Sequence, residues 1–257
     1  MTPSIMKSKL KQITASILVL LFWLFVWELA SRIVNLTFIL PGVFETFARL
    51  FELVITVDFW VTVSKTMGRI LLGFILGTLL GVLLAAICYK VSAINRVVSF
   101  AMTVVKSTPV ASFIMVLWII VGSASLPTVI ALLMVMPIIW QNILDGYNAV
   151  NNELSEVCDV FGFSRKKRIN VLVIPTLLSY FVPAALTSIG LAWKSGVAAE
   201  IIAYTRNSIG KNIHDAKAYF EGADMLAWTV TTVIISLAFE KLIKMLIRRF
   251  SRYGAIN

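Results

Sequence analysis

The sequence predicts an all-α membrane protein with six transmembrane helices. Of its 257 residues, 59% are hydrophobic and only 14% are charged, and the mean hydropathy of +0.91 lies far above that of soluble domains. Several stretches are apolar over the roughly 18 residues that a helix needs to cross a bilayer. These runs are continuous and do not alternate, which argues against a membrane β-barrel. We expect the spans at 16–33, 67–89, 97–121, 127–144, 170–199 and 225–243. The first is too long for a cleavable signal and lacks a small-residue cleavage site.

Basic residues mark one set of loops and predict the orientation. They precede the first span, separate the second from the third and the fourth from the fifth, and follow the sixth; on the other side we count only Arg49, Arg206, Lys211 and Lys217. Because cytoplasmic loops carry the excess of Lys and Arg, both termini are expected in the cytoplasm of a prokaryotic cell membrane. The net charge of +10 is explained by anionic lipid and requires no nucleic-acid partner.

The sequence offers little for catalysis or metal binding. Cys88 and Cys158 have no ligand-spaced partners, and His214 is the single histidine. A membrane-embedded enzyme would need clustered catalytic groups, which the scattered acids do not provide. We therefore expect a non-catalytic chain without a metal or a cofactor of its own.

Residues 43–55 predict a short amphipathic helix after a Pro41-Gly42 turn. Their apolar side chains recur at helical spacing, opposite Glu45, Arg49 and Glu52, and the stripe is too short to span. We expect this helix to lie at the outer interface, and we group residues 1–66, the first span and this helix, apart from a core domain at residues 67–250.

Three glycines at four-residue spacing mark one face of the second span: Gly73, Gly77 and Gly81. Small residues let helix backbones approach closely in lipid. The face predicts helix packing, either inside the bundle or against a second copy of the chain.

Charged and broken positions inside the spans suggest a translocation path. Lys194 follows Trp193 deep in the fifth span, where an ionisable group is costly and usually faces water or a partner. Glu200 lies six residues on, which is not a same-face spacing, so a direct pair with Lys194 is not expected. Pro109 interrupts the third span. These four residues are our candidates for lining a path, with a buried structural charge as the alternative for Lys194.

Residues 153–162 predict a short cytoplasmic helix in the loop at about 150–170. Asn151 or Asn152 is a suitable N-cap, the acidic residues complement the helix dipole, and Gly162 is a suitable stop. The helix is a candidate docking element. Its residues are Glu153, Glu156, Val157, Cys158, Asp159, Phe161 and Gly162.

The stretch EVCDVFGFSRKKRINVLVIP resembles the EAA loop of permease subunits of binding-protein-dependent ABC importers. Glu156 takes the glutamate position, Gly162 follows at the required distance, and Pro175 closes the pattern. The stretch departs from it at Val157, Cys158 and Ile174. The runs ILPGVFETFARLF, SKTMGRILLGFILGTLLGVLLA, KSTPVASFIMVLWIIVG and GLAWKSGVAAEII are similar, in order and spacing, to the nitrate, taurine and alkanesulfonate branch of these permeases.

The resemblance implies a type I importer permease that dimerises. Two cytoplasmic ATPases would bind ATP and Mg and dock at residues 153–162, and an extracytoplasmic solute-binding protein would deliver the solute. The chain has no phosphate-binding loop of its own, so ATP hydrolysis must come from the partner. The expected solute is a small anion. A thiamine pyrimidine precursor is the alternative within the family, and an ion-coupled secondary transporter is the alternative from another class.

Overall fold

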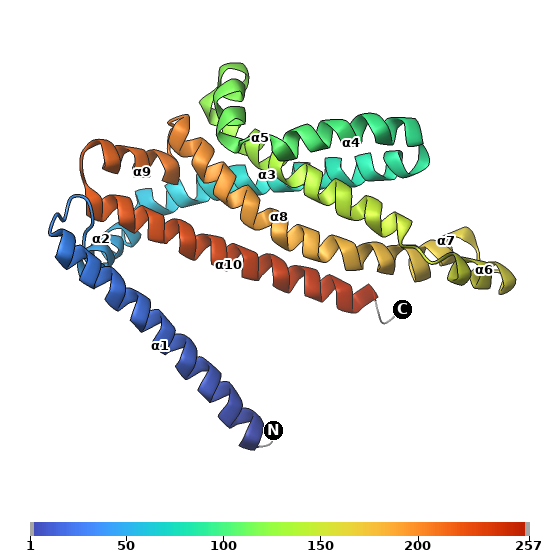
Figure 1. Cartoon of the computed structure of the whole chain (residues 1–257), viewed down its shortest axis with the longest axis horizontal. Coiled ribbons are helices and arrows are strands. Elements are labelled where there is room, and N and C mark those ends of the chain that lie inside the picture. The colour runs from blue at the N-terminus through green and yellow to red at the C-terminus, as the bar shows by residue number, and fades with distance from the viewer. Residues whose placement is uncertain (1–2, 255–257) are drawn as a thin grey trace. The chain divides into compact units, whose positions relative to one another are not determined.

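The computed structural model describes residues 3–254, and all regular structure in this range is helical (Figure 1). The all-α prediction is confirmed. The helices, in chain order, are α1 (Pro3–Val34), α2 (Val43–Val54), α3 (Val57–Lys90), α4 (Ser92–Ser107), α5 (Val110–Asn148), α6 (Asn152–Val160), α7 (Arg165–Arg168), a π-helix (Ile169–Val173), α8 (Ile174–Ile202), α9 (Ile209–Ala218) and α10 (Gly222–Gly254).

Five helical stretches in the described part of the chain are long and apolar enough to cross a membrane. They are Thr14–Val34, Val57–Lys90, Val110–Asn148, Arg165–Ile202 and Gly222–Met245. Each has at least 21 residues, and about 20 are needed to span the hydrocarbon. Five of the six predicted spans lie within separate stretches of this set, and the predicted span at 97–121 does not.

The predicted span at 97–121 is not one helix. Helix α4 ends at Ser107, Thr108 and Pro109 have extended backbone, and a new helix begins at Val110. Proline has no N–H to donate and disfavours helical backbone in the residue before it, so the helix stops at this point. With 16 residues, α4 alone is shorter than a span.

Helix α5 contains a second break, at Gly122. Its φ of 72° and ψ of 167° fall in a region that is essentially restricted to glycine. The break divides α5 into a first segment, residues 110–121, and a second segment, residues 123–148. The second segment includes the predicted span at 127–144.

The described chain divides into two compact units. The first combines residues 1–60 with 212–231, and the second combines 61–211 with 232–257, of which the structure describes residues up to 254. The expected division of the chain into residues 1–66 and a core domain at residues 67–250 stays a prediction.

The predicted amphipathic helix is α2, in the first unit. Its start is fixed to α1 because the backbone N–H of Val43 donates to Glu28 Oε2 at 2.9 Å. Thr46 is fully buried, whereas Phe44 and Phe51 are 83% and 74% exposed. One face of α2 therefore packs on its own unit, and its aromatic face is uncovered, as an interfacial helix requires.

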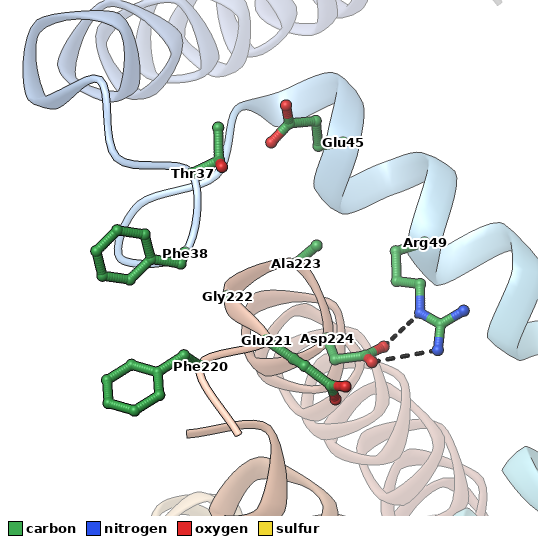
Figure 2. Close-up of a pocket in the computed structure, with 9 residues that line it drawn as sticks. All are labelled: Thr37, Phe38, Glu45, Arg49, Phe220, Glu221, Gly222, Ala223 and Asp224. Atoms are coloured by element: carbon green, nitrogen blue, oxygen red, sulfur yellow. Dashed lines mark hydrogen bonds and ion pairs between the residues drawn. The ribbon is translucent and has the colours of Figure 1, made fainter. Parts of the chain in front are cut away.

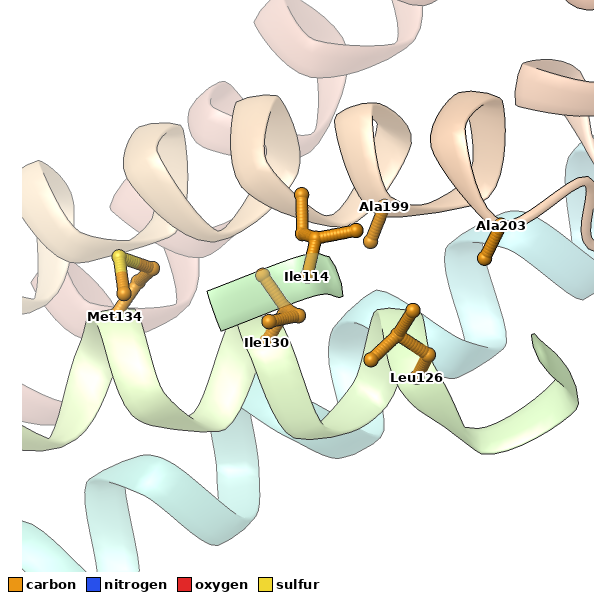
Figure 3. Close-up of a cluster of buried hydrophobic side chains, with 6 residues drawn as sticks. All are labelled: Ile114, Leu126, Ile130, Met134, Ala199 and Ala203. Carbon is orange, nitrogen blue, oxygen red and sulfur yellow. The ribbon is translucent and has the colours of Figure 1, made fainter. Parts of the chain in front are cut away.

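The second unit is held together by α3, α5 and α8. Helices α5 and α8 lie along one another (Figure 1) and share a cluster of buried side chains (Figure 3). The cluster consists of Ile114, Leu126, Ile130, Met134, Ala199 and Ala203.

The glycine face of α3 packs against α5 of the same chain. A Cβ added to Gly77 would lie 2.8 Å from the carbonyl oxygen of Leu132, and one added to Gly81 would lie 2.9 Å from that of Met136. A Cβ at Gly73 would collide with the backbone of Thr128. The three glycines thus permit close backbone contact inside the unit.

Candidate coupling helix and translocation face

Helix α6 is the predicted docking helix, and its N-terminus is capped by Asn151. The side-chain oxygen of Asn151 accepts hydrogen bonds from the backbone N–H groups of Glu153 at 2.7 Å and Leu154 at 3.2 Å. Of the two asparagines proposed as caps, Asn151 is therefore the one that caps the helix. Glu153, in the first turn, adds a negative charge where the helix dipole is positive.

Gly162 ends this helix in the manner expected of it. Its φ is +63°, a left-handed conformation that costs an L residue energy. The N–H of Phe163 donates to the carbonyl of Cys158 at 2.9 Å, and that of Gly162 donates to Asp159 at 3.0 Å. These two bonds form a Schellman motif. The predicted stop at Gly162 is confirmed.

The exposed apolar side chains of this region form a small apolar surface, which is the candidate docking surface. They are between 47% and 85% exposed and comprise Leu154, Val157, Val160 and Phe161. Glu153 and Glu156 are also exposed. The expectation that Cys158 is available to a partner is wrong, because its side chain is only 8% exposed. The backbone carbonyl of Cys158 accepts the hydrogen bond from Phe163 that closes the turn at Gly162.

Asp159 joins α6 to Arg168, which precedes the N-terminal end of α8. Arg168 Nη1 donates to both carboxylate oxygens of Asp159, at 2.9 and 3.2 Å, and lies 3.4 Å from Ser155 Oγ. Arg168 ends α7, and the π-helix connects α7 directly to α8. A displacement of α6 would therefore be carried into a continuous helical stretch, Arg165–Ile202, that is long enough to span the membrane.

Trp193 and Lys194 lie on different sides of α8. Trp193 is 1% exposed, and its Nε1 donates to the carbonyl of Thr232 at 3.1 Å, whereas Lys194 is exposed. Successive helix residues point about 100° apart, so neighbours in sequence can face a core and a surface. Trp193 anchors α8, and Lys194 is presented outward from the chain.

Glu200 is fully buried and has partners from two other segments. Its Oε2 accepts from Thr66 Oγ1 at 3.0 Å and from the backbone N–H of Gly210 at 3.3 Å, and its Oε1 accepts from Arg69 Nη1 at 3.3 Å. We call these four residues the Glu200 network. As the sequence spacing indicated, these bonds of Glu200 go to Thr66, Arg69 and Gly210 and not to Lys194. A role for Glu200 in a solute path stays a prediction.

Arg69 extends the network to the turn between α8 and α9. Its Nη1 and Nη2 donate to the carbonyls of Asn207 and Arg206, at 3.3 and 3.1 Å, and the N–H of Ile209 donates to Thr66 Oγ1 at 3.0 Å. Sequence reasoning missed Thr66 and Arg69. The available signal was the basic run SKTMGR at the start of the predicted span at 67–89, where a cation requires a partner.

Pro109 is exposed and is the N-cap of the second helix of the broken span. Its backbone carbonyl accepts from the N–H of Ser112 at 3.0 Å. Pro109, Lys194 and Glu200 all lie in the second unit, and the hydrogen bonds of Glu200 described above include neither of the other two. Their common role in a path therefore remains a prediction.

The first unit contains a charged hollow that the sequence did not suggest (Figure 2). Arg49 forms a two-point ion pair with Asp224, at 2.5 and 3.2 Å, and a bond to Glu52 at 2.7 Å. These hydrogen bonds, that to Asp224 above all, raise the pKa of the Arg49 guanidinium. The hollow has a volume of about 510 Å³, and Glu45, Glu221, Phe38 and Phe220 also line it. The pair links α2 to the start of α10, which are 175 positions apart.

Comparison with known protein families agrees with this architecture. Residues 77–252 match the family described as binding-protein-dependent transport system inner membrane component. No curated protein matched the chain. The matched range includes Gly77 and Gly81 of the glycine face, all of α6 and α8 and most of α10, and it covers more than half of the chain. This family consists of non-catalytic membrane subunits that work with an ATPase and a solute-binding protein. The chain belongs to the binding-protein-dependent transport system inner membrane components, the multi-pass permeases of ABC transport systems.

Proposed function

We propose that this permease works as a dimer and passes a small anionic solute along α8, driven by ATPases that dock on α6. The observation that carries the proposal is the exposed Lys194 inside Arg165–Ile202, a helical stretch long enough to span the membrane. The family assignment favours this function over the ion-coupled secondary transporter, which the sequence had left open as an alternative.

Lys194 belongs to an uncovered stripe of α8. Pro183, Thr187, Leu191 and Lys194 are exposed and recur at spacings of three and four residues. A Cβ added to Gly190 would meet no atom within 4 Å. The opposite face of α8 is buried, so the helix has one packed side and one open side.

Lipid is a poor environment for this stripe. A charged side chain in the bilayer is costly unless water or a partner covers it. At the centre of a helix the cost is roughly 2.5–3.5 kcal/mol on insertion scales. A second copy of the chain, with its own α8 stripe opposite, would enclose Lys194 in a polar space. The uncovered stripe thus supports both the dimer and the path.

The charge of Lys194 favours an anion. An ammonium group in a partly dehydrated path attracts a small anion such as nitrate or a sulfonate. Thr187 adds a hydroxyl whose hydrogen is used for the carbonyl of Pro183 at 3.0 Å, so its oxygen offers lone pairs only. The cationic contribution to the stripe therefore comes from Lys194.

The driving force would enter through α6. Leu154, Val157, Val160 and Phe161 supply an apolar docking surface, and Glu153 and Glu156 supply charge beside it. We propose that the partner ATPase holds ATP and Mg and receives these side chains in a cleft. Closure of two ATPases would move the two α6 helices, and the Asp159–Arg168 ion pair would pass this displacement to α8.

A sixth crossing is supported by the broken span. Helix α4 and residues 110–121 together provide 28 residues in two pieces, enough for one crossing at about 1.5 Å per residue. Counting them as one makes six crossings. An even number returns the two termini to the same side, which the charge distribution assigns to the cytoplasm.

The test is solute uptake by proteoliposomes that contain the permease, its ATPase and its binding protein. We expect Lys194→Met to reduce the uptake of the anionic solute at least about tenfold while the ATPase stays bound, because the path loses its cation. Lys194→Arg should retain most of the uptake. Lys90→Met, at an exposed lysine outside the stripe, is the matched control.

The solute panel should include nitrate, short sulfonates and a pyrimidine precursor. Uptake of the pyrimidine, with Lys194→Met as active as the unmodified chain, would favour the heterocycle importer over the anion importer. Full anion uptake by Lys194→Met would contradict the assigned path.

A further inference from the structure

The first segment of α5, residues 110–121, is bounded by non-helical backbone at both ends. Thr108 and Pro109 have ψ values of 131° and 133°, and Gly122 has a φ of 72° and a ψ of 167°. A helical hydrogen-bond ladder cannot pass through either point, so the segment is a rigid rod between two joints. A Cβ added to Gly122 would meet no atom within 4 Å, so the chain has room to move there.

One face of this segment packs on the α5–α8 cluster, where Val110, Phe113, Leu117 and Val121 are partly buried beside Ile114. Among residues 110–121, all of which the structure describes, only Ile114 is buried, at 1% exposure. Ile114 lies beside Ile130 and Ala199 in the α5–α8 cluster (Figure 3). In contrast, Met115, Val116, Ile119 and Ile120 are between 55% and 89% exposed. The second segment of α5 has twelve buried residues against this single one, so the first segment has less buried contact and opens more easily than the second.

The structure immediately beyond Gly122 is firmly held. Thr205 Oγ1 donates to the carbonyl of Ser123 at 2.8 Å, which fixes the chain just after the joint to the α8–α9 turn. Thr128 Oγ1 donates to the carbonyl of Arg69 at 3.1 Å, which fixes the second segment of α5 to α3.

The Glu200 network holds the same turn from the other side. It joins α3, α8 and α9 with a carboxylate that has no exposure to solvent. Opening it would leave a buried charge without a partner, which is strongly unfavourable. The ends of α3 and α8 and the second segment of α5 therefore form one fixed block, and movement is cheapest at the two joints.

From these contacts we propose that residues 110–121 are a gate that turns about Thr108–Pro109 and Gly122 against this fixed block. The gate closes on Ala199 and Ala203, at the end of α8 that lies a full helix length from α6. It opens when the Ile114 side chain leaves the cluster. The proposal rests on the proposed transport function, because it assigns the moving part of that path.

The experiment locks the gate chemically and reversibly. Ile114→Cys and Ala199→Cys are combined in a chain whose buried Cys88 and Cys158 are replaced by alanine, and the pair is joined by a short bifunctional methanethiosulfonate. In proteoliposomes with ATPase and binding protein, we expect crosslinking to lower uptake at least about tenfold, and dithiothreitol to restore it. The reversal separates a locked gate from a damaged fold.

The matched control joins Ile130→Cys to Ala199→Cys, which are in the same cluster but both in the fixed block. This crosslink should leave uptake within about twofold of the uncrosslinked level, because a gate motion does not separate the pair. Full uptake with the Ile114 pair crosslinked would overturn the gate. Equal loss with the Ile130 pair would show that the block itself rearranges, which would also overturn it. An uncrosslinked chain without ATP-dependent uptake would instead refute the transport function.

Discussion

Removal of the Glu200 carboxylate is the most informative change to the fold of the second unit. Glu200→Ala leaves Thr66 Oγ1, Arg69 Nη1 and the N–H of Gly210 without their common acceptor. Breaking a buried charge pair by deleting one partner typically costs about 3–5 kcal/mol. The side chain of Arg69 is 21% exposed and can recover water, so we expect a loss near the lower end of this range.

The conservative variant separates charge from hydrogen bonding. Glu200→Gln keeps one oxygen that can accept from Thr66 and Gly210 but loses the charge that attracts Arg69. The expected loss is about 1–2 kcal/mol, the difference between charge-assisted and neutral hydrogen bonds. The control is Glu240→Ala, which removes an exposed acid from α10 and should change stability by less than about 0.5 kcal/mol.

The assay is denaturant unfolding of the purified permease in mixed micelles, followed by tryptophan fluorescence. The expected order of stability is wild type, Glu240→Ala, Glu200→Gln and then Glu200→Ala. If Glu200→Ala unfolds within about 0.5 kcal/mol of the wild type, the buried network does not fix the block. If Glu200→Gln is as damaging as Glu200→Ala, the effect does not come from the hydrogen bonds described above.

Three further predictions concern packing, coupling and the first unit. Gly77→Ala should destabilise the unit by about 1–3 kcal/mol in the same unfolding assay, because its Cβ would lie 2.8 Å from the carbonyl oxygen of Leu132. The control Gly68→Ala, which has open space around its Cβ, should be neutral or stabilising by up to about 1 kcal/mol. Gly162→Ala should weaken recovery of the ATPase with the tagged permease, since it strains the left-handed turn by about 1–2 kcal/mol. Gly162→Asn should recover more ATPase than Gly162→Ala, because asparagine tolerates this conformation better. Equal recovery by both variants would contradict the role of the left-handed turn in docking. A double-mutant cycle with Arg49→Gln and Asp224→Asn should give a coupling free energy of about 1 kcal/mol, because the pair is partly exposed; a coupling near zero would show that it does not hold α2 to α10.

Local sequence patterns predicted local structure well in this chain. The N-cap of α6, its stop at Gly162 and the amphipathic α2 all depend on residues within a few positions of one another. The composition predicted a membrane protein, and the long continuous apolar runs predicted that its spans are helices. Each of these features follows from short-range geometry or from bulk hydrophobicity, which one sequence contains in full.

The missed features depend on contacts between distant residues or on competing local effects. Arg69 and Glu200 are 131 positions apart, and no periodicity relates them. Cys158 has the spacing of the candidate docking face, yet it is buried. At Pro109, hydropathy favoured one continuous span, but the missing N–H and the restricted backbone of Thr108 ended the helix.

The energy source of uptake tests the central claim most directly. Proteoliposomes containing the permease, its ATPase and its binding protein are supplied with labelled anion, either with ATP and Mg at the ATPase side or with a proton or sodium gradient alone. We predict accumulation with ATP, none with either ion gradient, and none with ATP when the ATPase is omitted. Accumulation by the permease alone under an ion gradient would contradict the account of α6 as the entry point of the driving force.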